Sequence, residues 1–484
     1  MKKTPVLLGA VVAVGALYVG STWYVGKQAQ QAIEQGVAQI NERVVKMLGP
    51  DLSASQFHIQ IEAYERGVLS SSGRYVIHTS DSDGQPMQYV MHDHLQHGPF
   101  PLDLLKKGVF APQLGYSRAQ MEVTPAIREW FDASEADTPL AAETRVGFGG
   151  QGISTWAFAP FELERGQQHI SFSGGTLQVA FNKGVNNNTA SGQFDRYSMV
   201  DSALGEHIEL RNIQLGSTTR EVAAGHFEHH STARVKSLTF WVNHDMQPVH
   251  IEDLDVALAS TQQQHLLDAG IRYDAARILV EGSDLGRMTA SGAVNRLDIP
   301  ALTALQNTYA ELARKHGGDP NEPFEPTLEE QQLLEAQLRP ILAAGPRLVL
   351  DPLEWTNPAG RVHANASVSL RDPGDVDDAF LPEVLRQLVD SASLHLSVDR
   401  AMVVELFRQV AGGNEDEQEQ AGEFGGMLFD QYAEILGGIG LATLSNGTLS
   451  LSLEATPGED RFVLNGDVLT TDQLMILMLG LMLL

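Results

Sequence analysis

A two-residue hydrophobic period dominates the sequence between residues 53 and 299. The clearest segments are Phe57–Ile61, Leu177–Phe181, Leu238–Val242 and Leu254–Leu258. Successive side chains of a β-strand point to opposite faces, so this alternation predicts strands with one apolar and one wetter face. Parallel strands buried on both faces would be continuously apolar and would alternate with helices. The sequence therefore predicts an antiparallel meander sheet.

Two stretches with a helical pattern interrupt this sheet. Residues 300–345 carry an apolar stripe and a capping-box sequence at Thr327–Glu330. Residues 379–440 are also helical in pattern, with a short strand at Leu394–Val398 and an acidic segment, 414–423, that we interpret as a solvated loop. Asn465-Gly466 between apolar runs predicts a hairpin.

We therefore expect an α+β, β-rich fold: a long curved antiparallel meander sheet with two helical insertions, after one N-terminal transmembrane helix. The expected regions are a transmembrane anchor (1–27), a membrane-proximal helix (28–50), a β-rich region (51–299), a helical insertion (300–345), a β continuation (346–378), a helical region with a short strand (379–440), and a closing β-hairpin with a C-terminal helix (441–484).

The first residues predict a membrane anchor. Lys2 and Lys3 precede an uncharged run, residues 4–26, which as a helix would be about 34 Å long and could cross a bilayer core. A cleaved signal peptide has a shorter apolar core, of about 7–15 residues, so we favour a retained anchor. The two lysines predict a cytoplasmic N-terminus, with the bulk of the chain outside the inner membrane, which in a Gram-negative cell is the periplasm.

The next segment has the spacing of a helical seam. Apolar residues recur at alternating intervals of four and three, at Ile33, Val37, Ile40, Val44 and Met47. Such a helix either packs on its own domain or pairs with a second copy in a homodimer, and two heptads are too few to decide between these.

Charge and composition exclude several classes of function. Acidic residues outnumber basic ones 61 to 33, and a net charge of -28 opposes nucleic-acid binding. The chain has no cysteine, which excludes disulfides, iron–sulfur clusters, zinc fingers and thiol catalysis. It has no G-x-S-x-G elbow, P-loop or H-E-x-x-H sequence, and no G-x-G-x-x-G that opens a helix after a strand. We therefore expect a protein without a cofactor and without enzymatic activity.

His92 and His94 are the residues that most suggest a metal site. On a strand they would point to the same face, about 7 Å apart, as an H-x-H pair can do when it binds a metal. Asp93 would point the other way, and His97 follows where Gly98-Pro99 must end the strand. Surface histidines are therefore the favoured interpretation, and a metal-dependent hydrolase that uses His92 and His94 is the least favoured function.

Several short blocks carry a resemblance to a known family. They are Trp23-Tyr24-x-Gly26-Lys27, the segment from Tyr64 to Ser71, the sequence HGPFPL from His97 to Leu102, the block from Pro352 to Asn357, and Val398-Asp399 with its following helix. In this order and spacing the chain resembles the YdgA-like family of bacterial envelope proteins, whose molecular function is unknown. The resemblance implies an inner-membrane anchor and self-association. It implies no reaction, cofactor or catalytic residue.

The HGPFPL residues predict a rigid corner. Gly98 permits backbone angles closed to other residues, and Pro99 and Pro101 each fix one φ angle. Phe100 would be held rigidly between them, able to fill an apolar pocket or to form part of a recognition surface. The functional hypotheses are, first, an anchored envelope protein whose sheet holds a lipid-like ligand or an envelope partner and, second, a dimeric envelope scaffold.

Overall fold

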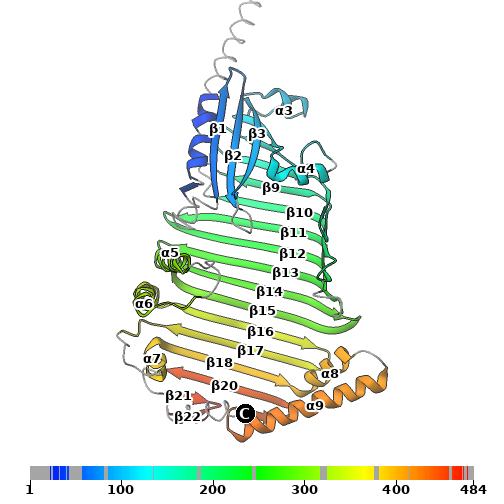
Figure 1. Cartoon of the computed structure of the whole chain (residues 1–484), viewed down its shortest axis with the longest axis vertical. Coiled ribbons are helices and arrows are strands. Elements are labelled where there is room, and N and C mark those ends of the chain that lie inside the picture. The colour runs from blue at the N-terminus through cyan, green and yellow to red at the C-terminus, as the bar shows by residue number, and fades with distance from the viewer. Residues whose placement is uncertain are drawn as a thin grey trace, which may run out of the picture. The chain divides into compact units, whose positions relative to one another are not determined.

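The computed structural model describes residues 22, 26–31, 33–39, 41–42, 57–80, 86–134, 136–182, 187–241, 247–316, 324–374, 381–411, 414–456, 461–470, 473 and 477. The chain divides into two compact units: Met1–Asp201 with Asn212–Glu221, called unit 1, and Ser202–Arg211 with Val222–Leu484, called unit 2. Both are built mainly from antiparallel strands (Figure 1). The predicted β-rich antiparallel architecture is confirmed.

Unit 1 begins as a meander. Its strands are β1 (Phe57–Arg66), β2 (Ser70–Ser80), β3 (Pro86–His97), β4 (Gly115–Glu122), β5 (Leu140–Val146), β6 (Gly152–Phe158), β7 (Phe161–Arg165), β8 (Gln168–Phe172), β9 (Gly175–Phe181) and β10 (Asn188–Asp201). From β1 to β6 each strand pairs with the next. β6 then pairs with β9 and β9 with the first half of β10, while the β7–β8 hairpin pairs with the second half of β10. β11 (Glu206–Ala223) contributes residues to both units.

Among the described residues of the region that the sequence predicted as strand, three elements are short helices. They are α3 (Leu102–Lys106), η1 (Pro125–Ile127) and α4 (Arg128–Ala133). Each is too short to show a helical hydrophobic period, which explains why the pattern missed them. Ile127 nevertheless closes a core cluster with Met91 and Met121, against which Trp130 and Trp156 pack.

The remaining strands belong to unit 2, and several of them are long. They are β12 (His226–Trp241), β13 (Val249–Gln263), β14 (Leu266–Val280), β15 (Ser283–Asp298), β16 (Arg347–Asn357), β17 (Gly360–Leu370), β18 (Val389–Asp399), β19 (Thr443–Ser445), β20 (Thr448–Thr456), β21 (Arg461–Leu464) and β22 (Asp467–Leu469). Neighbours from β12 to β18 pair in sequence, β18 pairs with β20, and β20 pairs with β19 and β21. The predicted short strand is thus an 11-residue strand, β18, paired on both sides.

Two local sequence signals, a hairpin turn and a helix capping box, are confirmed. Asn465-Gly466 joins β21 to β22, and both residues have positive φ, 52° and 96°. A two-residue hairpin turn of this kind needs such angles, and Asn-Gly adopts them readily. Thr327 accepts a hydrogen bond from the Glu330 backbone, and the Glu330 side chain accepts one from the Thr327 backbone, which completes the predicted capping box.

Five helices have both ends within the described part of unit 2. They are α5 (Ile299–Lys315), α6 (Leu328–Ala343), α7 (Leu381–Leu388), α8 (Arg400–Ala411) and α9 (Glu415–Gly438). In Figure 1, α5, α6 and α7 stand at one end of the strands, and α8 and α9 at the other. The predicted loop at 414–423 is wrong, because these residues form the start of α9. Asn414 and Glu417 make a second capping box, and acidic residues favour the positive end of the helix dipole.

The described part of residues 28–50, which the sequence predicted as a membrane-proximal helix, lies against the first strand of unit 1. Asn41 donates to the Ile59 carbonyl at 2.8 Å and accepts from the Ile59 amide at 2.9 Å, so its helical segment lies against β1. Ile33 and Val37 are half-buried, whereas Ile40, Val44 and Met47 lie outside the described residues.

Both predicted terminal helices fall mainly on residues that the structure does not describe. Of residues 4–26, only Thr22 and Gly26 are described, and of the predicted C-terminal helix only Gln473 and Leu477. Within the described ranges no helix combines the length and the apolar character needed to cross a membrane.

Candidate functional site

The sheet of unit 2 carries an apolar face. Residues directly opposite each other on paired strands point to the same side, so the register defines rows of side chains that run across the sheet. One row consists of Leu258, Ile271, Gly292, Leu350, Ala366 and Leu394, on β13 to β18 in that order. The adjacent row consists of Val256, Tyr273, Ala290, Leu353, Ala364 and Leu396. The Tyr273 hydroxyl is the one polar side-chain group in these twelve positions.

Solvent reaches side chains in both rows, from β13 to β18. Leu258, Tyr273, Leu350 and Leu394 are 38%, 46%, 37% and 37% exposed. Toward the α8–α9 end the same side of the sheet is covered, because Phe429 and Ala433 of α9 pack with Leu449, against which Val398 lies. The exposed rows therefore continue the hydrophobic core of unit 2 beyond the part that α9 covers. We call the two rows the apolar face.

The opposite face of the same strands is ionic. Arg234 pairs with Asp255 at 2.7 Å, and Arg287 pairs with Asp274 at 2.8 Å. Partial burial alone would raise the pKa of Asp274, but hydrogen bonds from Arg287 and Thr289 hold it below its usual value. These ion pairs are solvated and keep one side of the sheet wet, which leaves the apolar face as the side available to a nonpolar partner.

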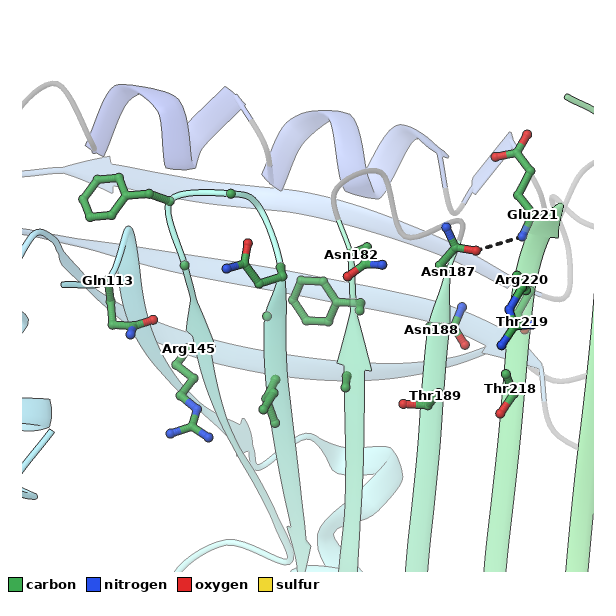
Figure 2. Close-up of a pocket in the computed structure, with 18 of the residues that line it drawn as sticks. Gln113, Arg145, Asn182, Asn187, Asn188, Thr189, Thr218, Thr219, Arg220 and Glu221 are labelled. Carbon is green, nitrogen blue, oxygen red and sulfur yellow. Dashed lines mark hydrogen bonds between the residues drawn. The ribbon is translucent and has the colours of Figure 1, made fainter. Parts of the chain in front are cut away.

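Unit 1 contains a polar pocket with a volume of about 860 Å³. Its lining comes from the ends of β5, β6, β9, β10 and β11 and from the chain at Gln113. Figure 2 shows Gln113 and Arg145 at one end of this row of strands and Thr218 to Glu221 at the other, with Asn182, Asn187 and Asn188 between them. Asn187 Oδ1 accepts a hydrogen bond of 2.9 Å from the Glu221 backbone amide, so the Asn187 side chain, one residue before β10, is held against β11.

The predicted metal candidates lie on the outer side of β3. His92 and His94 are both exposed, and Asp93 between them is buried, as the alternation predicts. Burial raises the pKa of Asp93, while hydrogen bonds from Ser117 and Tyr75 oppose that rise. Across the described part of the chain, no group of three histidine or acidic side chains is placed to hold a metal ion.

His97 occupies a different position, in the interior of unit 1. It is only 2% exposed, and its Nε2 lies 2.7 Å from Ser71 Oγ while its Nδ1 lies 3.2 Å from the Val68 carbonyl oxygen. Burial lowers the pKa of His97, and nearby Arg66 lowers it further, while hydrogen bonds to the backbone at Val68 and Thr22 oppose this. Gly26 lies directly against the ring, since a β-carbon there would be 2.6 Å from Nδ1.

The rest of the HGPFPL sequence forms a corner between β3 and α3. The Gly98-Pro99 peptide is cis, Gly98 donates to the Leu114 carbonyl at 2.8 Å, and Gln113 donates to the Pro99 carbonyl at 2.9 Å. Pro101 precedes the first residue of α3, Leu102. Phe100 is 37% exposed and Leu102 is 59% exposed, so neither side chain fills the interior; Leu104 does.

Three of the sequence blocks that carried the resemblance thus meet at His97: Gly26 from the first, Val68 and Ser71 from the second, and His97 itself from the third. The sequence model of a family described as "Bacterial protein of unknown function (DUF945)" matches residues 1–471. The chain belongs to this family.

Two proteins of Escherichia coli are similar to the chain over nearly their full length. The chain is 24% identical to "Protein YdgA" of Escherichia coli (strain K12), over 98% of this chain and 96% of that protein. It is also 24% identical to "Uncharacterized protein YihF" of the same organism, over 96% and 97% of the two chains. No solved structure matches it. The expected YdgA-like membership is confirmed, and the family description supplies no activity.

Proposed function

We propose that this chain is a non-enzymatic protein of the bacterial envelope, anchored in the inner membrane through residues 4–26, that binds lipid acyl chains on the apolar face of unit 2. The observation that carries the proposal is the exposed double row of Leu258, Tyr273, Leu350 and Leu394 and their neighbours. An apolar surface of this extent on a protein with a net charge of -28 is a candidate contact for a nonpolar partner.

The dimensions of the apolar face suit an acyl chain. Each row crosses six strands, and five spacings of about 4.8 Å make it about 24 Å long. Half of a bilayer core of about 30 Å is about 15 Å, which is the depth that one extended acyl chain spans. Burying Leu or Tyr side chains that are more than one-third exposed removes apolar area from water at about 25 cal/mol per Å². The anchor would keep the protein beside its ligand.

The test compares two charge substitutions on one strand. In Leu258→Glu the carboxylate enters the apolar face; in the control, Ala257→Glu, it enters the ionic face, directly opposite Arg272. The full chain, purified in detergent, is incubated with a phospholipid that carries a photoactivatable acyl chain, and labelled peptides are identified by mass spectrometry. We expect labels on β13 to β18, labelling reduced at least fivefold in Leu258→Glu, and little change in Ala257→Glu. Equal labelling of both variants, or no label in unit 2, would refute the proposal.

The contacts of Asn41 bear on the dimeric scaffold hypothesis. Its two hydrogen bonds to Ile59 attach the membrane-proximal helix to its own chain, which favours packing within the protomer. For the hydrolase hypothesis, His92 and His94 have no third ligand among the residues that the structure describes.

A further inference from the structure

We propose that the polar pocket of unit 1 is a second binding site, separate from the apolar face, and that its ligand is an oligosaccharide carrying a carboxylate or phosphate group. The chemistry of the lining carries this inference. Eight of the lining side chains are amides or hydroxyls, two are arginines (Arg145 and Arg220), two are phenylalanines (Phe148 and Phe181), and one is an acid (Glu221).

Amide and hydroxyl groups match the needs of a sugar. Each sugar hydroxyl both donates and accepts, and Asn, Gln and Thr side chains offer both functions as well. Hydrogen bonds within the protein already hold part of the pocket wall in place. The Asn187 side chain accepts one from the Glu221 backbone amide, and the Asn182 backbone amide donates one to the Asn187 backbone carbonyl at 3.0 Å. Phe148, 56% exposed, offers an apolar surface on which the C–H face of a sugar ring can pack.

The charges favour an anionic ligand. Both Arg145 and Arg220 are exposed, and within the described ranges neither guanidinium has a carboxylate within 4.0 Å. A guanidinium is a planar fork that binds carboxylate or phosphate through two parallel hydrogen bonds. Two such groups against one acid, Glu221, make a locally cationic site on a chain whose overall charge is strongly negative.

The size of the pocket suits an oligosaccharide. A volume of about 860 Å³ lies near the upper end of the range of about 300–1,000 Å³ that is typical of ligand pockets, so the pocket can hold more than one sugar ring. The turn between β5 and β6 lines the pocket with Gly147 and Gly149, and Gly152 follows as the first residue of β6. These glycines make room for two other lining side chains, because a β-carbon at Gly149 would clash with Gln151 and one at Gly152 would clash with Phe181.

The test uses isothermal titration calorimetry on the full chain in detergent, with four probes of matched concentration: a neutral oligosaccharide, a uronate oligosaccharide, a sugar phosphate and inorganic phosphate. We expect at least one of the two anionic saccharides to bind at least tenfold more tightly than the neutral one, and which of them does so identifies the acidic group. Arg145→Ala and Arg220→Ala should each weaken that binding at least fivefold. Arg165→Ala is the control, since Arg165 lies on β7 outside the pocket and is largely exposed.

Several results would overturn the inference. They are saccharide binding that the two pocket variants do not change, equal affinity for neutral and anionic saccharides, no saccharide binding, and binding of inorganic phosphate alone, which would identify an adventitious ion only. Leu258→Glu should leave saccharide affinity unchanged, so failure of the acyl-chain proposal and failure of this one are separate outcomes.

Discussion

The contact between Gly26 and His97 gives the sharpest test of how the N-terminal segment is held. Gly26 lies in a helical segment, and a β-carbon at this position would approach three atoms of the His97 ring more closely than nonbonded atoms tolerate. The ring has little freedom to move, because it is buried and Ser71 and the Val68 carbonyl oxygen hold its two nitrogens. Gly26→Ala should therefore strain this junction.

A second glycine supplies the matched control. Gly36 is also helical, and a β-carbon there would meet no atom within 4 Å. Replacement of a helical glycine by alanine normally stabilises a helix by about 0.8–1 kcal/mol, so Gly36→Ala should raise stability by that amount. Gly26→Ala makes the same gain but also overpacks a filled site, at a cost of about 1–3 kcal/mol. The two variants should therefore differ by about 1–3 kcal/mol.

The assay is scanning calorimetry of the full chain in detergent, combined with hydrogen exchange at residues 26–42. For a unit of about 200 residues, 1 kcal/mol corresponds to about 2–4 °C in Tm, so a difference of 2 kcal/mol is about 4–8 °C. The decisive measurement is a double-mutant cycle with His97→Ala. Without the ring, Gly26→Ala should become as favourable as Gly36→Ala. If both glycine variants shift Tm equally, or if the effect of Gly26→Ala persists without the ring, the reasoning is refuted.

Two further predictions concern the same region. Because burial lowers the pKa of His97, the unfolded chain binds a proton at a higher pH than the folded chain does, so unit 1 should lose stability as the pH falls below about 6.5. Urea unfolding at pH 7.5 and at pH 5.5 measures this loss. The difference in stability between the two pH values should disappear in His97→Ala and persist in the control, His94→Ala. Since Asn41 attaches its helix to β1 of the same chain, the double variant Ile33→Asp/Val37→Asp should leave the oligomeric state unchanged in analytical ultracentrifugation. If a wild-type dimer dissociates in this variant, the predicted helical seam between two copies is supported instead.

The apolar period predicted which side chains share a face. Leu254, Val256 and Leu258 lie together on β13, and the register extends their rows to residues far away in the sequence. Alternation is a property of each strand, so it is readable locally. Whether helices cover the resulting face is set by packing between elements, which the period does not encode. The start of α9 was readable, because Asn414-x-x-Glu417 is a capping-box sequence, but the acidic run concealed it.

The polar pocket could not be predicted in the same way. Its lining comes from separate segments around Gln113, Arg145, Asn182, Thr189 and Arg220, each of which ends or begins a strand without a motif of its own. Their meeting depends on the order in which the strands pair, above all on the pairing of β6 with β9 across the β7–β8 hairpin. A site of this kind is a product of topology.

The HGPFPL sequence illustrates how a family signature can mark structure instead of chemistry. Its histidine resembles a reactive group, since Nε2 lies within hydrogen-bond distance of a serine hydroxyl and Nδ1 is oriented by a carbonyl oxygen. That is the geometry in which an imidazole could activate a nucleophile. Ser71 and His97 are, however, 3% and 2% exposed, and Gly26 closes one side of the ring, so a substrate has no route to the hydroxyl. The pair is better explained as a structural contact that holds the N-terminal segment against β2 and β3. Ligands are expected at the two open surfaces, which are the apolar face and the polar pocket.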